Sequence, residues 1–150
     1  MTQTFYERVV EQKTVTDVRL LTLPRFLDPN GELVVFEDQS GLPFDVKRVF
    51  SVSATEGDIR GEHAHKKCGQ VLWCPLGAID VTCDDGQAKR TFRLDHSTFA
   101  LFLPATIWAR QLYREKNSVL VVLCDMPFQE ADYIRDYDTF MEWRKELVAQ

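Results

Sequence analysis

The chain has 150 residues, 45% of them hydrophobic and 27% charged, which is typical of one globular domain that buries its core without a disulfide or a structural metal. Its net charge of -5 argues against a general nucleic-acid-binding protein, because such proteins carry a basic face that neutralises phosphates. The four cysteines form no C-x-x-C pair, so a zinc knuckle or a thioredoxin-like motif has no support, and we expect reduced, mostly buried thiols.

The chain carries no linker, no repeat and no low-complexity tract, so residues 1–150 are interpreted as a single domain. Residues 1–11 lack the apolar stretch of a secretory signal, and no run elsewhere approaches the length of a membrane span. We therefore expect a cytoplasmic protein whose partners include neither a membrane nor a nucleic acid.

Short β-rich segments separated by turn residues follow one another along the chain. The turn residues Asp28-Pro29-Asn30-Gly31 and Asp84-Asp85-Gly86 are two such separators, and the second indicates a hairpin. The predicted strands cover residues 18–23, 32–36, 46–53, 70–74, 78–83, 89–94, 99–103, 108–113 and 118–124. Only the tail differs, because residues 137–148 carry apolar side chains at helical spacing and predict a C-terminal helix with Asp138 as its candidate cap.

Strands at such regular intervals, followed by one late helix, predict an all-β fold that is an antiparallel sandwich or barrel. The cupin-type double-stranded β-helix, a jelly-roll barrel, with a short C-terminal helix is one such solution. An open sheet of this kind has edges that must be covered. Exchange of N-terminal strands between two subunits would cover them, so we expect a homodimer of that kind.

The most informative stretch is Arg60-Gly61-Glu62-His63-Ala64-His65-Lys66. In an extended strand, residues two apart point to the same side, so His63 and His65 present two imidazoles to one face. A solvent-facing pair is the alternative interpretation. The neighbouring Arg60 and Lys66, together with Gln70 five residues after His65, favour a polar binding site instead.

A metal centre is a further interpretation of the histidine pair, and the count of ligands argues against it. Gln70 stands where cupins commonly have a metal-binding Glu, and Trp108 stands about where a distant His ligand is expected. The remaining histidine, His96, lies in a predicted loop and is expected to be exposed. Two imidazoles alone rarely hold a catalytic metal firmly, so we expect no metal and no other cofactor. Histidine transfers protons near neutral pH, which makes acid–base chemistry the leading prediction.

Several runs together resemble the sugar 3,4-ketoisomerase family, also described as WxcM-like cupins. They are residues 60–66 with Gln70, residues 84–86, Pro104 with Trp108, and residues 130–137, and the similarity extends from about Asp28 to Phe140. The resemblance implies an isomerase that moves the keto group of dTDP-4-keto-6-deoxyglucose from C4 to C3 through an enediolate, as a dimer without a required metal. The two histidines of the family match His63 and His65.

Within this resemblance, His65 is assigned as the base that acts on the sugar C–H bond, and His63 as the group that moves protons between the oxygens. Arg60 is expected to stabilise the developing oxyanion. Residues 132–137 are interpreted as an ion-paired corner that closes the barrel rather than as catalytic residues.

The nucleotide end of such a substrate needs cations and a flat apolar face. Arg48 and Lys66 are candidates for the pyrophosphate, and Trp108 for stacking on the sugar or the base. A plain surface charge is the alternative for Arg48, and a core aromatic is the alternative for Trp108.

Two other functions remain open at this point. A nucleotide-sugar 3,5-epimerase is also a cupin acting on a keto sugar, and it would use a His backed by a carboxylate together with a Tyr acid. A non-catalytic sugar-binding cupin would bind the same ligand without exchanging any proton. A metal-dependent dioxygenase is the interpretation that the sequence favours least.

Overall fold

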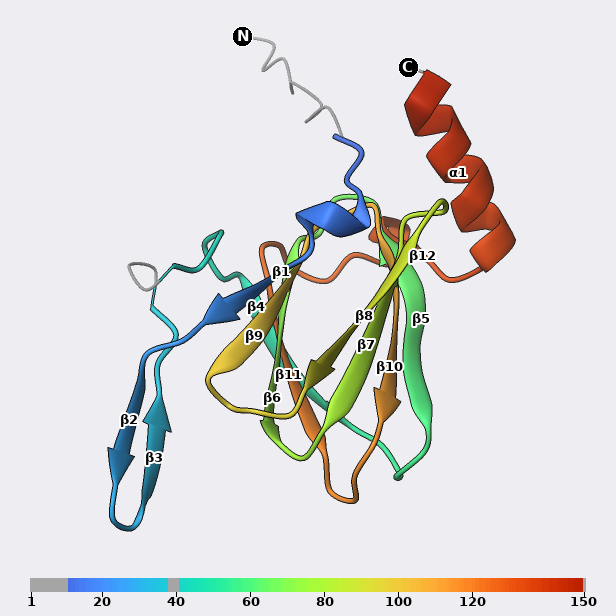
Figure 1. Ribbon diagram of the computed structural model, residues 1–150. Helices are drawn as coiled ribbons and strands as arrows, with labels where there is room; N and C mark the ends of the chain where they lie inside the picture. The colour runs from blue at the N-terminus through green and yellow to red at the C-terminus, as the bar shows by residue number, and fades with distance from the viewer. Residues whose placement is uncertain (1–10, 38–40, 150) are drawn as a thin grey trace, which may run out of the picture.

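The structure, a computed structural model, describes residues 11–37 and 41–149. Two antiparallel sheets of five strands each lie face to face (Figure 1). The first sheet has the order β1-β9-β6-β11-β4, with β1 at Arg19–Thr22, β9 at Phe99–Leu103, β6 at Gln70–Leu76, β11 at Val119–Cys124 and β4 at Arg48–Ser53. The second has the order β12-β5-β10-β7-β8, with β12 at Tyr133–Ile134, β5 at Ile59–His65, β10 at Trp108–Tyr113, β7 at Ile79–Asp84 and β8 at Lys89–Leu94.

The predicted all-β fold with one C-terminal helix is confirmed by this arrangement. The sequence predicts a barrel, whereas the two sheets stay separate in the part of the chain that the structure describes. Among the described strands, no hydrogen-bonded ladder joins the edge strands of one sheet to those of the other. The fold is therefore a jelly roll of two facing sheets.

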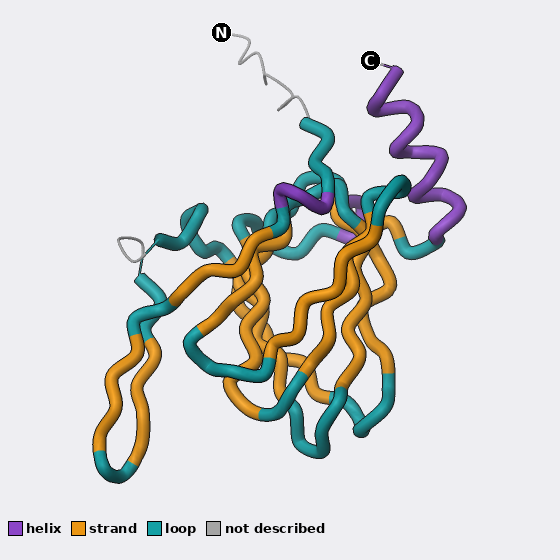
Figure 2. The backbone as a smooth tube through the Cα atoms, viewed as in Figure 1, coloured by secondary structure: helices purple, strands orange, loops and turns teal. Residues whose placement is uncertain are grey.

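A two-stranded ribbon projects to one side of the sheets (Figure 1), and Figure 2 shows it as two adjacent extended segments. It consists of β2 (Arg25–Asp28) and β3 (Gly31–Val34), joined by the predicted turn. β2 is absent from the strands that the sequence predicts. All four of its residues are exposed, so the strand has no burial pattern that the sequence could reveal.

The core lies between the two sheets. β7 illustrates the alternation that builds this core: Ile79, Val81 and Cys83 are fully buried, whereas the residues between them are only partly buried. β11 is apolar throughout because both of its faces are covered. Leu120 belongs to the main core cluster, whereas Leu123 belongs to a second cluster on the opposite face of the same sheet.

The helix α1 (Tyr137–Ala149) packs on the outer side of the second sheet through Phe140, which is fully buried beside Trp108. Its cap is Asp136, whose carboxylate accepts a hydrogen bond of 2.9 Å from the Thr139 backbone N–H. The prediction of Asp138 as the cap is therefore wrong by two residues. Asp138 lies in the first turn, where its negative charge still favours the helix N-terminus.

No helix within the described ranges combines the length and the hydropathy that crossing a lipid bilayer requires. Two single-turn 3-10 helices complete the description, η1 at Val15–Asp17 and η3 at Glu130–Asp132.

β5 contains a bulge at Gly61 and Glu62, which sets how the following residues face the core. The ladder with β10 pairs His63 with Ala109 and shifts its register immediately afterwards, so that Glu62 is the extra residue. Both bulge residues have positive φ angles, 83° and 56°. A Cβ at Gly61 would overlap the side-chain amide of Gln111, so the position requires glycine for space as well as for backbone conformation.

Gly61→Ala is expected to lower the free energy of unfolding by about 1–3 kcal/mol, because alanine is strained at this φ and its methyl group displaces the Gln111 amide. Urea denaturation of the variant and the unmodified protein measures the difference. Gly31→Ala is the matched control, since a Cβ there meets no atom within 4 Å. An equal loss in both variants would mean that the bulge has no special requirement for glycine.

Candidate active site

The side chains of His63 and His65 lie together on the face of β5 that is turned toward the other sheet. Their ring centroids are 5.0 Å apart and their planes are nearly perpendicular, at 85°. His65 is 4% exposed, and His63 is partly buried. Both rings line a small cavity of about 10 Å³, roughly the space of one water molecule, together with Gln70 and Gln111. The structure thus places the two imidazoles side by side, as the strand spacing predicts.

Asp132 holds one side of the His65 ring. Its Oδ2 lies 2.8 Å from His65 Nδ1, and its Oδ1 accepts a hydrogen bond of 2.7 Å from the Lys67 backbone N–H. Burial by itself raises the pKa of this carboxyl, but the hydrogen bonds from His65 and from the Lys67 and Cys68 backbone outweigh it and lower the pKa. A carboxylate accepting from Nδ1–H leaves the lone pair on Nε2. That Nε2 is buried and has no partner in the described residues, so its lone pair remains available to accept a proton.

The contact between Asp132 and His65 is one that the interpretation of residues 132–137 as an ion-paired corner does not include. The corner exists, since Arg135 forms an ion pair of 3.0 Å with Glu130. Asp132, however, is paired with the histidine rather than with a cation. It reaches His65 because β12, which begins at the next residue, pairs Tyr133 with His65 in the ladder to β5.

Tyr133 lies across both imidazoles. Its ring centroid is 4.4 Å from that of His65 and 5.1 Å from that of His63. The Arg135 guanidinium stands over the outer side of the tyrosine ring at 4.3 Å. The site therefore contains a His backed by a carboxylate and a nearby Tyr in addition to the His-x-His pair. A carboxylate-backed His and a nearby Tyr are also the features expected of a 3,5-epimerase, so they do not separate the two enzyme classes here.

The environment of His63 keeps its ring neutral. Burial, followed by the neighbouring His65, lowers the pKa of His63 to about 4, although a hydrogen bond with the Gly61 backbone acts in the opposite direction. The Nδ1 atom of His63 is buried without a partner among the described residues. At neutral pH this imidazole is therefore able to accept a proton.

The lowered pKa of His63 makes the fold sensitive to mild acid. Between about pH 6.5 and pH 4, His63 binds a proton in the unfolded chain but stays neutral in the folded chain. The free energy of unfolding therefore falls as the pH falls through this window. We expect His63→Gln to make this dependence shallower. Urea denaturation at several pH values between 4 and 7 measures it, with His96→Gln, at an exposed position, as the control. The same slope in His63→Gln and in the unmodified protein would contradict the assignment.

Two more of the predicted substrate-binding residues lie close to the pair. Gln70 is buried, lines the same cavity and donates to Cys124 Sγ at 3.6 Å. Arg48 donates to the same sulfur at 3.5 Å and also interacts with Tyr133, so it stands behind the histidine cluster. Gln70 and Arg48 therefore share the Cys124 sulfur as a hydrogen-bond acceptor.

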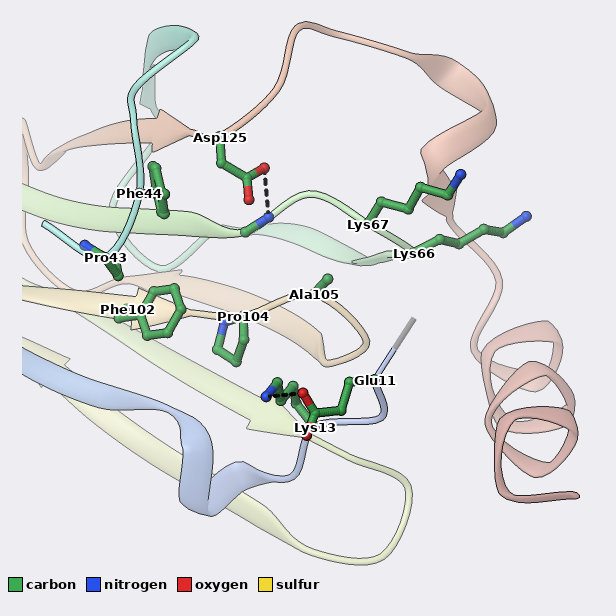
Figure 3. A pocket seen from close by; sticks show the side chains of 11 residues that line it. Glu11, Lys13, Pro43, Phe44, Lys66, Lys67, Phe102, Pro104, Ala105 and Asp125 are labelled. Carbon is green, nitrogen blue, oxygen red and sulfur yellow. Dashed lines mark hydrogen bonds and ion pairs between the residues drawn. The ribbon is translucent and has the colours of Figure 1, made fainter. Parts of the chain in front are cut away.

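Lys66 lines a neighbouring and larger cavity of about 290 Å³ (Figure 3). Lys13 and Lys67 also line it, and Pro104 borders both this cavity and the small one at the histidines. The larger cavity thus combines amino groups with the apolar ring of Phe102, and Figure 3 shows the two neighbouring lysines extending from the same loop.

Arg60 and Trp108, the other two predicted substrate-binding residues, lie away from the histidine pair. Arg60 is exposed and precedes the bulge, and it does not line the cavity of the histidines. Trp108 pairs with Ala64 in the ladder, so it shares the outer face of the sheet with this alanine rather than the inner face with the histidines. It packs there against Tyr137 and Phe140.

Three functional candidates were missed by the sequence reasoning: Asp132, Tyr133 and Gln111. Asp132 and Tyr133 belong to a run that the family resemblance includes, and this was the only signal that could have pointed to them. Among the described residues, His65, Cys68 and Asp132 also form a group whose ligand atoms are close enough to hold a metal ion.

Comparison with known proteins agrees with this geometry. The chain matches the model of the FdtA family, described as WxcM-like, C-terminal, over residues 16–145. It is 34% identical over 126 residues to a TDP-4-oxo-6-deoxy-alpha-D-glucose-3,4-oxoisomerase of Aneurinibacillus thermoaerophilus. The aligned residues make up 83% of this chain and 91% of the relative.

Solved structures with the same fold include two ketoisomerases. QdtA, a sugar 3,4-ketoisomerase from Thermoanaerobacterium thermosaccharolyticum in complex with TDP, has a TM-score of 0.83 at 28% identity, covering 89% of this chain and 98% of QdtA. A 3,4-ketoisomerase from Helicobacter canadensis has a TM-score of 0.81 at 30% identity, covering 86% and 98%. The fold and the site thus define a cupin-like jelly roll with a buried histidine pair. The chain belongs to the FdtA family of WxcM-like proteins, as the resemblance in its sequence predicts.

Proposed function

We propose that this protein is an isomerase that moves the keto group of dTDP-4-keto-6-deoxyglucose from C4 to C3. The observation that carries the proposal is the buried pair of His63 and His65, with His65 Nδ1 held 2.8 Å from Asp132 and Nε2 left free. The relatives support the substrate class, since one is a TDP-4-oxo-6-deoxyglucose 3,4-oxoisomerase and another is a sugar 3,4-ketoisomerase with bound TDP.

The reaction begins when His65 Nε2 removes the proton from C3 of the sugar. The electrons of that bond form a C3–C4 double bond, and the C4 oxygen becomes the oxyanion of an enediolate. His63, whose ring is neutral, passes the proton of the C3 hydroxyl to the C4 oxygen. His65 then returns its proton to C4, which leaves the carbonyl at C3. The sugar is oxidised at C3 and reduced at C4, so no external oxidant or reductant is required.

The oxyanion of the enediolate requires stabilisation by a cation or by hydrogen-bond donors. Arg48 is better placed for this role than Arg60, because it interacts with Tyr133 beside the histidine rings, whereas Arg60 is exposed. Arg48 Nε is also buried without a partner in the described part of the chain, so it has a hydrogen bond left to donate.

We assign the diphosphate of the nucleotide to the larger cavity, where Lys66 and Lys67 supply positive charge and Lys13 is paired with Glu11 at 3.0 Å (Figure 3). This cavity shares Pro104 with the histidine cavity, so a sugar at the histidines has its phosphates beside the lysines. The Gln70 amide at the histidines adds a hydrogen-bond donor for the sugar. Trp108 lies on the other face of the sheet and is not assigned to the substrate.

A 3,5-epimerase is the second candidate, and the Asp132–His65 pair with Tyr133 nearby is the observation that favours it. Incubation of the purified protein with dTDP-4-keto-6-deoxyglucose in D₂O, followed by NMR of the product, separates the candidates. Isomerase activity gives a carbonyl at C3 and deuterium at C4. A carbonyl that stays at C4 with deuterium at C3 or C5 would mean epimerase, and a sugar that exchanges no hydrogen would mean a binding protein.

The same proposal includes a homodimer with exchanged N-terminal strands, working in the cytoplasm. The short strand β1 lies at the edge of the first sheet, where an exchanged strand could pair with it, and the residues before position 11 lie outside the described residues. Apolar side chains on the projecting ribbon add to the surface that a partner would cover, and Phe26 is 61% exposed. Four buried cysteines without a disulfide are compatible with a reducing compartment. Light scattering after size-exclusion chromatography tests the dimer, and a monomeric mass would reject it.

A further inference from the structure

Three side chains of different metal-ligating types lie close together beside the histidine pair, and His65 itself is one of them. His65, Cys68 and Asp132 each offer one ligand atom, and these atoms all lie within 4.8 Å of one another. The three residues are only 4%, 1% and 6% exposed. They come from the end of β5, the loop after it and the residue before β12, so the fold alone brings them together.

From this juxtaposition we infer that His65, Cys68 and Asp132 form an inhibitory binding site for a thiophilic divalent cation, with Zn²⁺ as the best fit. The set of one nitrogen, one sulfur and one carboxylate oxygen suits Zn²⁺, whereas Mg²⁺ and Ca²⁺ require oxygen ligands. With Zn–S near ~2.3 Å and Zn–N or Zn–O near ~2.1 Å, tetrahedral ligand atoms stand about 3.5 Å apart. Movements of about 1 Å or less would therefore bring the described atoms to that geometry.

A second observation supports the site. The His65 ring lines the small cavity beside the cluster. Cys68 lines the same cavity, whose volume of about 10 Å³ has room for one water as a fourth ligand.

The surroundings also hold the carboxylate in place. Asp132 Oδ1 is fixed by the Lys67 backbone N–H at 2.7 Å, and an outer hydrogen bond of this kind orients a metal-binding carboxylate. This set is distinct from a His-x-His-Glu-His arrangement, since Gln70 and Trp108 occupy two of those positions and His63 is not among the three residues.

The consequence for activity rests on the proposed function. A cation bound at this cluster takes the place of the proton between His65 Nδ1 and Asp132, and the ring then carries its proton on Nε2, so His65 can no longer act as the base at C3. Cys68 has no step in the proton transfers. Its removal therefore abolishes the response to Zn²⁺ and leaves the isomerisation itself intact.

The test uses the chelator-treated full-length protein and the metal alone. Titration with Co²⁺ is expected to produce a thiolate-to-metal charge-transfer band at one ion per chain, and Zn²⁺ is expected to remove the band by competition. Cys68→Ser should lose the band and weaken Zn²⁺ binding by about 10–100-fold or more. Cys74→Ser is the matched control, because Cys74 is equally buried in the core and lies outside the cluster, so the band should persist in this variant.

Activity provides the second readout. Zn²⁺ should inhibit the unmodified protein and Cys74→Ser but not Cys68→Ser. The inference is overturned if no thiolate band develops, if Cys74→Ser loses the band as Cys68→Ser does, or if Zn²⁺ inhibits both variants equally. Should Cys68→Ser not fold, as judged by circular dichroism, Cys68→Ala and Asp132→Asn replace it in the binding measurement. If the charge-transfer band develops but the protein has no isomerase activity, the proposed function is wrong and the inferred metal site is still supported.

Discussion

His65→Asn is expected to reduce turnover of dTDP-4-keto-6-deoxyglucose by roughly 10²–10⁴-fold or more, because this is the contribution typical of a positioned general base. The substitution removes Nε2, the atom that faces the cavity, while an asparagine amide still donates to the Asp132 carboxylate. The buried carboxylate therefore keeps a partner and the fold persists. NMR of the product measures the turnover, and circular dichroism with thermal unfolding checks the fold.

His96→Asn is the control for this variant. His96 is exposed and lies outside the site, so its replacement should leave turnover unchanged. Turnover of His65→Asn close to that of the unmodified protein would remove His65 from the role of base. The function would then have to rest on His63 or on Tyr133.

Asp132→Asn has the second-largest expected effect. The carboxylate accepts a hydrogen bond from His65 Nδ1–H and so leaves the lone pair on Nε2. An amide at this position donates its N–H₂ to Nδ1 instead, which moves the ring proton to Nε2 and blocks the base. The loss in kcat should be on the order of 10²–10⁴-fold, because a wrong tautomer has cost about that much in a buried His–Asp pair of another enzyme.

The Michaelis constant separates this positioning role from a general structural effect. Asp132 makes no contact with the proposed substrate, so KM should change little while kcat falls. Glu130→Gln is the matched control, since Glu130 lies two residues earlier and its exposed ion pair with Arg135 contributes little. Equal losses in the two variants, or a fall confined to KM, would contradict the assignment.

The histidine pair could be placed from the sequence because it depends only on local geometry. Alternation along a strand puts His63 and His65 on one side, and the surrounding polar residues indicate a site. The same rule could not tell which side of the strand faces the core. For Trp108 the register with Ala64 decided the matter, and it lies on the outer face under α1.

Local sequence patterns do not predict the contact between Asp132 and His65. Asp132 is 67 residues from His65 in the chain and lies in a charged run that resembles an ion-paired turn. Only the pairing of β12 with the end of β5 brings the two side chains together. Gly61 is similar, since its freedom of conformation is visible in the sequence, but its role in making room for Gln111 requires the position of the neighbouring strand.

The sequence by itself determined the all-β class, the late helix and the two imidazoles, because these follow from side-chain periodicity and from turn residues within short segments. The tertiary structure decided that the sheets stay separate, that Asp132 holds His65 and that Cys68 stands beside them. These features depend on contacts between residues distant in the chain. Such contacts arise from strand pairing and sheet packing, which no single segment specifies.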